Sequence, residues 1–122
     1  MAALIHLTTE LRSHVLVVRI TSEKLIEPKD VHEFDAELAR VVQEQTQRAM
    51  MIDFARVNRI ATGVINSLLL TKKKMLASGG DMVLFGMRQN IRHTCRLLRL
   101  DGTIFQIFEE EDQAIGHFQV DT

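Results

Sequence analysis

The sequence predicts an α/β fold in which a mixed sheet of about five strands is sandwiched between about four helices. Two observations support this prediction. Short β-branched runs alternate with segments whose apolar residues recur at helical spacing, and the alternation begins after two strands in direct succession. The expected order is strand, strand, helix, strand, helix, strand, helix, strand, helix. Because the 122 residues are 46% hydrophobic and 25% charged, a single domain spanning 1–122 is expected.

The opening segment is predicted to be a β-hairpin followed by a helix. Its β-branched residues form two runs, Ala3–Thr8 and His14–Ile20, and the polar residues 9–13 between them are expected to form the turn. Apolar residues then recur at helical spacing after Pro28, which suits the first turn of a helix because proline lacks a backbone N–H. This helix is expected to end near Gln45.

Two later strands are expected to be buried on both faces, because each is a short continuous apolar run. They are Ala49–Phe54 and Asp81–Gly86. The helix between them is expected to end at Ser78-Gly79-Gly80, where glycine can adopt the left-handed conformation that ends helices. Its predicted apolar stripe consists of Ile65, Leu68, Leu69, Met75 and Leu76, with Lys72, Lys73 and Lys74 at the edge.

The remaining elements are predicted to be a helix, a strand and a helix. Ile91, Cys95 and Leu98 mark the apolar face of the third helix, and four arginines lie on its other face. The last strand is expected at Ile104–Phe108, and the acidic residues 109–112 suit the start of a fourth helix. Parallel strands of such a sheet end at one edge, where a functional site is expected.

Charge is distributed unevenly along the chain. The net charge is −2 over residues 1–52, +7 over residues 53–100 and −6 over residues 101–122, which gives −1 in total. The near-neutral total argues against binding nucleic acid or an anionic membrane through bulk charge. The asymmetry has two interpretations: a basic face that meets an acidic partner, or basic middle helices that neutralise the acidic end of the chain.

The sequence contains no recognisable catalytic or metal-binding motif. Phosphate-binding glycine loops, paired cysteines and the His-Glu-x-x-His pattern are all absent. Ser67, His93 and Asp53 have no motif that would support a catalytic triad, and Cys95 is expected to be a buried structural thiol. No enzyme activity, cofactor or metal is therefore predicted. The histidines, which have no spacing that would bring two to one metal, are His6, His14, His32, His93 and His117.

The chain is expected to be cytoplasmic. Its apolar stretches are too short to span a membrane, and its first residues do not form a basic segment followed by an apolar one, as a signal peptide would. A single cysteine cannot close an intrachain disulfide.

The segment that joins the middle strand to the second helix is the most informative part of the sequence. Thr62 is expected to be the helix N-cap, and Gly63 permits close approach to the backbone. The free amides and the dipole of a helix start favour an anion, such as a phosphate or a partner's carboxylate. The predicted partner-binding residues are Arg56, Asn58, Arg59, Ala61, Thr62, Gly63, Val64 and Asn66.

Several segments together resemble the STAS domain, the family of sulfate transporter and anti-sigma factor antagonist domains. The resemblance is carried by residues 51–54, Val57, Ile60, the Thr62-Gly63 turn, Leu68-Leu69 and residues 78–86, and the other elements follow in the family's order over nearly the whole chain. It implies a STAS-like fold and a non-enzymatic regulatory role. Free-standing bacterial members bind an anti-sigma factor that is also a serine kinase, and phosphorylation of the antagonist ends the interaction.

The chain departs from this family's pattern at the turn. Switching members usually carry Asp-Ser-Ser-Gly there, with phosphate accepted by the second serine, and these positions correspond to Ala61, Thr62, Gly63 and Val64. Gly63 has no hydroxyl, so the resemblance implies a docking surface that is either unregulated or regulated by phosphorylation of Thr62.

Two basic residues also depart from the family's pattern. Arg56 and Arg59 flank the turn where small or apolar residues are usual, which favours a partner that presents acids or phosphate. The expected partner is an anti-sigma factor or a serine-kinase-like regulator. The alternatives are a stressosome-like scaffold subunit that assembles with other STAS proteins, and a sensor that binds a small ligand or lipid at the carboxyl edge of the sheet.

Overall fold

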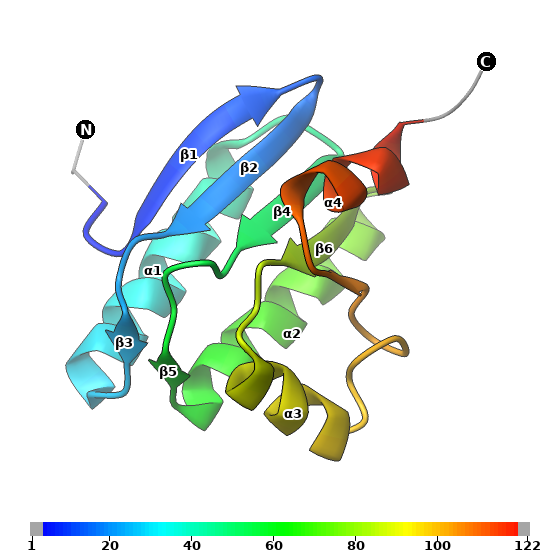
Figure 1. Cartoon of the computed structure of the whole chain (residues 1–122). Helices are drawn as coiled ribbons and strands as arrows, with labels where there is room; N and C mark the ends of the chain where they lie inside the picture. Colours follow the sequence, from blue (N-terminus) through cyan, green and yellow to red (C-terminus); the bar gives the residue numbers. More distant parts are fainter. Residues whose placement is uncertain (1–3, 120–122) are drawn as a thin grey trace.

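The computed structural model describes residues 4–119, and its main feature is a five-stranded sheet with helices on both faces (Figure 1). The strand order is β1-β2-β4-β6-β7, with β1 antiparallel to β2 and the other neighbours parallel. Helices α1 and α2 cover one face and α4 covers the other. The elements are β1 (Leu7–Arg12), β2 (Val15–Ile20), β3 (Lys24–Leu25), α1 (Pro28–Glu44), β4 (Ala49–Asp53), β5 (Arg59–Ile60), α2 (Thr62–Ala77), β6 (Asp81–Phe85), α3 (Gln89–Leu97), β7 (Ile107–Phe108) and α4 (Glu111–Phe118).

The predicted α/β sandwich and its order of elements are confirmed. The structure adds two short strands, β3 and β5, which pair in parallel through Lys24 with Arg59 and Leu25 with Ile60. Strands of two residues are too short to produce a periodic pattern in the sequence. They join the segment before α1 to the segment before α2, so the starts of these two helices are held together.

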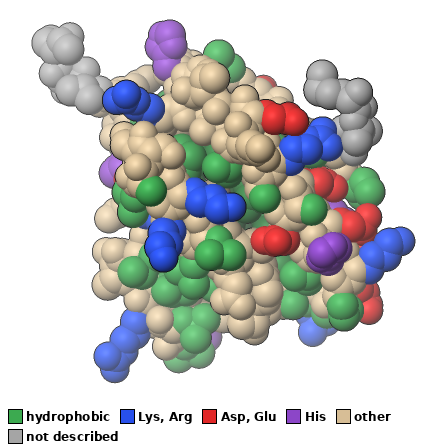
Figure 2. Space-filling view, turned by 180° about the vertical axis from the view of Figure 1, so that it is seen from behind, with side chains coloured by type: hydrophobic (Ala, Val, Ile, Leu, Met, Phe, Trp, Pro, Cys, Tyr) green, Lys and Arg blue, Asp and Glu red, His purple; other side chains and the backbone are tan. Residues whose placement is uncertain are grey.

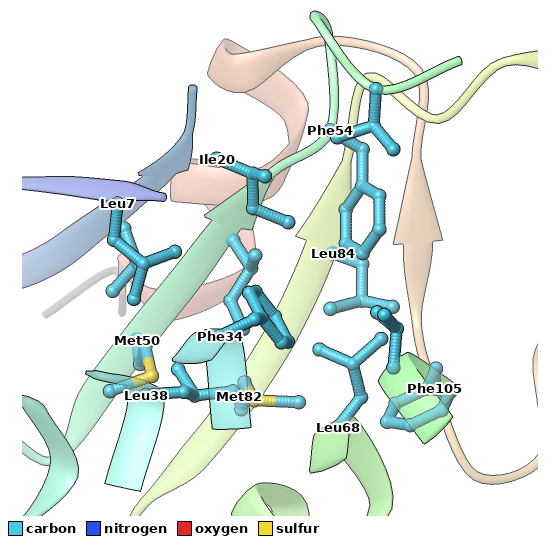
Figure 3. Packing of buried hydrophobic residues seen from close by; sticks show 14 of the residues in the cluster. Leu7, Ile20, Phe34, Leu38, Met50, Phe54, Leu68, Met82, Leu84 and Phe105 are labelled. Atoms are coloured by element: carbon cyan, nitrogen blue, oxygen red, sulfur yellow. The ribbon is translucent and has the colours of Figure 1, made fainter. Parts of the chain in front are cut away.

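Alternation along the central strands produces two apolar cores. On β4, Met50 and Ile52 face the core under α1 and α2, whereas Met51 faces the smaller core under α4. Figure 3 shows the larger core, where Phe34 of α1 and Leu68 of α2 point toward side chains from the sheet. The prediction that β4 and β6 are buried on both faces is therefore confirmed.

The predicted position of the hairpin turn is wrong. The strand β1 continues to Arg12, and the turn consists of Ser13 and His14, both of which have positive φ values (49° and 68°). The cause is that β1 is an edge strand whose residues after Leu7 are mostly exposed and polar, so the segment resembles a turn in the sequence. Ala3, at the start of the predicted strand, lies outside the described residues.

The predicted faces of α2 and α3 need correction in detail. Lys72 is buried at 9% exposure and pairs with Asp81, whereas Leu76 is 55% exposed. Leu98 follows α3 as its C-cap and is 51% exposed. The last strand is shorter than expected, because only residues 107–108 pair with β6 as a strand. Within residues 4–119, no helix combines the length and the apolar character that crossing a bilayer requires.

The acidic end of the chain is neutralised mainly by the hairpin and not by the middle helices. Glu111 and Asp112 pair with Arg12, and Glu111 also pairs with Arg19. The expected pairing with the basic middle is found at Asp101, which contacts Arg92 and Arg96 of α3. The tertiary arrangement places α4 over β4 and β6, close to the hairpin, and this proximity decides the pairing.

Candidate functional site

The segment that leaves β4 is anchored by its own backbone. The Phe54 amide donates to the Phe85 carbonyl (2.9 Å), and the Val57 amide donates to the Phe54 carbonyl (2.9 Å). The side chains of Phe54 and Val57 are fully buried, and the exposed Arg56 lies between them. The segment thus turns sharply at the carboxyl edge of the sheet and holds one basic side chain in solvent.

A second set of hydrogen bonds fixes the same segment to its neighbours. The Asn58 amide donates to the Glu23 carbonyl (2.7 Å), and the Ala61 amide donates to the Leu25 carbonyl (2.8 Å). The side-chain amide of Asn90, on α3, donates to the Asn58 carbonyl (2.9 Å). Contacts from both sides therefore hold this segment in a defined shape.

The start of α2 differs from the prediction. The N-cap is Ala61, in extended conformation (ψ 160°), and no side chain caps the helix; Thr62 is the first helical residue and is exposed. The reason is that the pairing of β3 with β5 continues through the Ala61 amide, which keeps Ala61 extended. The first-turn amides of α2 have no side-chain cap, although the Val64 amide donates to the Ala61 carbonyl (3.0 Å), and the helix dipole favours negative charge at this end of the helix.

Gly63 lies against α1. A Cβ atom at this position would lie 2.7 Å from Cγ1 of Val31, so the two helices approach closely at this point only because residue 63 has no side chain. Beside this contact is a groove of about 540 Å³ between the first halves of α1 and α2. Two exposed apolar side chains line it, Ile26 at 39% and Leu70 at 56% exposure. The neighbour that approaches Gly63 is thus the Val31 side chain of the same chain, and the predicted approach of a partner to this backbone stays a prediction.

A smaller hollow lies on the other side of the same helical turn. It measures about 150 Å³ and is lined by residues that include Arg59, Thr62, Asn90 and Thr94. The first turn of α2 therefore stands between two depressions, with Gly63 facing one and Thr62 facing the other.

The sequence-predicted residues divide by exposure. Arg56, Arg59, Thr62 and Asn66 are exposed, whereas Asn58, Ala61 and Gly63 are half-buried. Val64 is fully buried in the larger core, where it supports the turn from beneath. The structure adds lining residues from the start of α1, which sequence reasoning missed because no local pattern reports a contact between distant segments. They are Ile26, Pro28, Val31, His32 and Asp35.

The residues considered for catalysis are engaged elsewhere. Ser67 donates to an Asp35 carboxylate oxygen (2.6 Å), and Asp53 accepts from Arg19 (2.8 Å), while His93 is exposed. Cys95 is buried at 2% exposure, and burial raises the pKa of its thiol, so it is a structural residue as expected. Within residues 4–119, Ser67, His93 and Asp53 are thus not assembled into a catalytic triad.

The STAS domain family model matches residues 6–114. This chain belongs to the STAS family. Among solved structures, an anti-sigma factor antagonist from Mycobacterium paratuberculosis is similar over 91% of each chain, with 20% identity and a TM-score of 0.78. The anti-sigma factor antagonist SpoIIAA in its unphosphorylated form is 13% identical, covering 92% of this chain and 96% of its own, with a TM-score of 0.67.

A further solved relative is Moorella thermoacetica RsbS carrying a serine-to-glutamate substitution. It is 16% identical and covers 93% of this STAS chain and 94% of its own, with a TM-score of 0.73. No curated protein matches the chain. The resemblance seen in the sequence is confirmed, and the chain has the fold of anti-sigma factor antagonists, which are non-enzymatic regulators.

Proposed function

We propose that this STAS domain is a regulatory module that binds an anti-sigma factor or a serine-kinase-like regulator through the first turn of α2. The observation that carries the proposal is the surface on either side of that turn. An apolar-lined groove lies beside Gly63, and a hollow of mixed polar and apolar lining that includes Arg59 lies beside Thr62. A partner that places apolar side chains in the groove and acidic ones near Arg56 and Arg59 would match both parts of the surface.

The chemistry of this surface supports regulation through Thr62 and not through Gly63. Gly63 has no hydroxyl, and a serine there would press on Val31. Thr62 is exposed and directly precedes the position that switching members phosphorylate, whereas Ser67, whose hydroxyl donates to the Gly63 carbonyl (3.1 Å), is buried. A phosphate on Thr62 would add about 1.5–2 negative charges beside the uncapped amides of α2 and close to Arg59, which lines the same hollow. The phosphate would neutralise the charge of Arg59, which the acidic groups of the partner are proposed to contact.

Charge reversal tests the docking surface. Each serine-kinase-like anti-sigma factor encoded in the same genome is purified and titrated against the wild-type chain and against an Arg56→Glu, Arg59→Glu variant. Binding should weaken at least about tenfold, because two favourable charge contacts become repulsive. The matched control is Lys73→Glu with Lys74→Glu, an equal charge change at the exposed far end of α2. Equal affinity of the wild type and the Arg56, Arg59 variant would contradict the proposal.

Phosphorylation is tested separately with the regulator that binds. Incubation with ATP followed by mass spectrometry should place phosphate on Thr62, and Thr62→Val should prevent it. The phosphorylated chain should bind the regulator at least about tenfold more weakly. A chain that acquires no phosphate while still binding would leave the docking surface in place and eliminate regulation through Thr62.

A further inference from the structure

A buried histidine lies beside two carboxylates, away from the turn of α2. His6, just before β1, is 5% exposed, and its Nε2 atom has no hydrogen-bond partner. Nε2 lies 3.6 Å from a Glu33 oxygen and 4.0 Å from an Asp30 oxygen, both on the first turns of α1. These separations are too long for hydrogen bonds. A buried polar atom without a partner is costly, so the arrangement requires a physical explanation.

The three ligand atoms have the spacing that a metal ion needs. One atom from each of His6, Asp30 and Glu33 lies within 4.8 Å of the other two. Zinc bound to nitrogen and oxygen at about 2.0–2.2 Å in tetrahedral geometry separates its ligands by roughly 3.4 Å. The 3.6 Å separation is close to this value. The 4.0 Å separation of His6 and Asp30 is longer, but Asp30 and Glu33 are partly exposed, so their side chains are free to move closer to the imidazole.

The surroundings hold the imidazole in the orientation that metal binding requires. Nδ1 of His6 lies 2.6 Å from the Ser22 hydroxyl oxygen, so the ring has a hydrogen-bond partner on the side away from the carboxylates. The Glu37 carboxylate accepts from the backbone amides of Ile5 (3.0 Å) and His6 (2.9 Å), which fixes the backbone. A hydrogen bond from the second ring nitrogen is the usual way in which proteins orient a histidine ligand.

We propose that His6, Asp30 and Glu33 bind a zinc ion, with water completing its coordination. One imidazole and two carboxylates suit zinc, whereas magnesium takes oxygen ligands. The ion would link the segment before β1 to α1 and would satisfy the buried Nε2. Asp30 and Glu33 are partly exposed, so an ion can reach them from solvent; Figure 2 shows acidic side chains interspersed with basic ones on the face opposite to that of Figure 1.

Calorimetry of the chelator-treated full chain with zinc chloride tests the proposal. One equivalent of zinc should bind, and the melting temperature should rise with zinc concentration because the ion binds the folded state. Glu33→Gln and Asp30→Asn should each weaken binding at least about tenfold, and His6→Gln should do the same if it folds. The matched control, His93→Gln, removes an exposed histidine on α3 and should bind zinc like the wild type.

Three results would overturn the zinc site. The first is the absence of stoichiometric zinc binding to the wild-type chain. The second is unchanged affinity in Glu33→Gln and Asp30→Asn, both of which alter partly exposed side chains and should fold, as circular dichroism will verify. The third is equally tight binding of magnesium chloride, because it would assign the site to the carboxylates alone.

Discussion

At the scale of single residues, the contact between Gly63 and Val31 limits the size of the side chain that position 63 can carry. Any side chain at 63 must displace a β-branched side chain from the neighbouring helix, since the added Cβ would lie 2.7 Å from it. The Val31 side chain therefore occupies space that the family's serine would need at position 63. A serine at this position would therefore require the Val31 side chain to shift.

A double-mutant cycle tests this coupling. Gly63→Ser should destabilise the fold by about 1 kcal/mol, because overpacking outweighs the gain in helix propensity. Val31→Ala should cost about 1 kcal/mol through lost apolar contact. The double variant should be more stable than the sum of the two costs predicts, because the smaller alanine makes room for the serine. Urea unfolding measures all three, and strict additivity would contradict the contact.

Lys72 shows a second constraint that a single residue imposes. Its buried ammonium pairs with Asp81 and donates to the Met82 carbonyl (3.0 Å). Desolvation opposes ionisation of Asp81, but hydrogen bonds from Lys72 and from the Met82 amide outweigh it and lower the pKa of this carboxyl. This ion pair explains why Lys72, which was predicted at the edge of the apolar stripe of α2, is buried in the structure.

Substitution of Asp81 and substitution of Lys72 should destabilise the fold by different amounts. Asp81→Asn leaves a buried ammonium with weaker acceptors and should cost about 2 kcal/mol. Lys72→Met keeps the length of the side chain and leaves a carboxylate that water can reach, so it should cost less, about 1 kcal/mol. Chemical denaturation measures both variants. A larger loss in Lys72→Met than in Asp81→Asn would refute this account.

At the scale of elements, the hairpin turn shows where local pattern fails. Ser13 and His14 both adopt the left-handed conformation, as a two-residue hairpin turn with positive φ at both positions requires. Neither residue is glycine or asparagine, which favour this kind of turn, so the sequence contains no strong hairpin signal at this place. Tertiary pairing of β1 with β2 and of β2 with β4 outweighs the local cost.

Replacing these two residues by Asn-Gly should therefore stabilise the chain. Ser13→Asn with His14→Gly should raise the free energy of unfolding by about 1 kcal/mol, because the new pair relieves left-handed strain. Thermal and urea unfolding would register the gain. The same pair placed at Thr103 and Ile104, in a loop where neither residue has a positive φ, serves as a control and should give no gain. A loss of stability in the hairpin variant would argue against the turn.

At the scale of the whole molecule, a charge network joins the hairpin, β4 and α4. Arg19 contacts Glu10, Asp53 and Glu111, and Glu111 also accepts from Arg12 (2.7 Å). Hydrogen bonds from Arg19 and then Arg12 lower the pKa of Glu111 below its ordinary value of 4.5 despite partial burial. The contacts of Arg12 and Arg19 with Glu111 connect residues 99 and 92 positions apart in the chain and fasten α4 to the sheet.

The network predicts how the stability of the fold changes as the pH falls. The pKa of Glu111 is lower in the folded state than in the unfolded state. Its contribution to stability is therefore fully present above the pKa of the unfolded state and is lost as the pH falls through the pKa of the folded state. Glu111→Gln should cost about 1 kcal/mol at pH 7, a small value because the group is partly exposed, and the difference from wild type should vanish under strongly acidic conditions. Urea unfolding at pH 7 and pH 2 measures this, and a difference that persists undiminished at pH 2 would refute it.

The sequence by itself determined the layers and the chemistry of the turn. Continuous apolar runs at β4 and β6 and helical spacing in α1 identify buried strands and covering helices, because burial acts on every residue of an element and leaves a periodic pattern. Gly63 likewise excludes phosphorylation at that position whatever the fold. For these features, the tertiary structure added only where each strand, each helix and the turn lie in space.

Only the tertiary structure decided which distant residues meet. Val31 against Gly63, the pairing of β3 with β5, and His6 between Asp30 and Glu33 each join segments that have no shared local pattern. Such contacts arise from the packing of complete elements, and a single residue in one element does not specify its neighbour in another. The groove beside α2 and the proposed zinc site both depend on contacts of this kind.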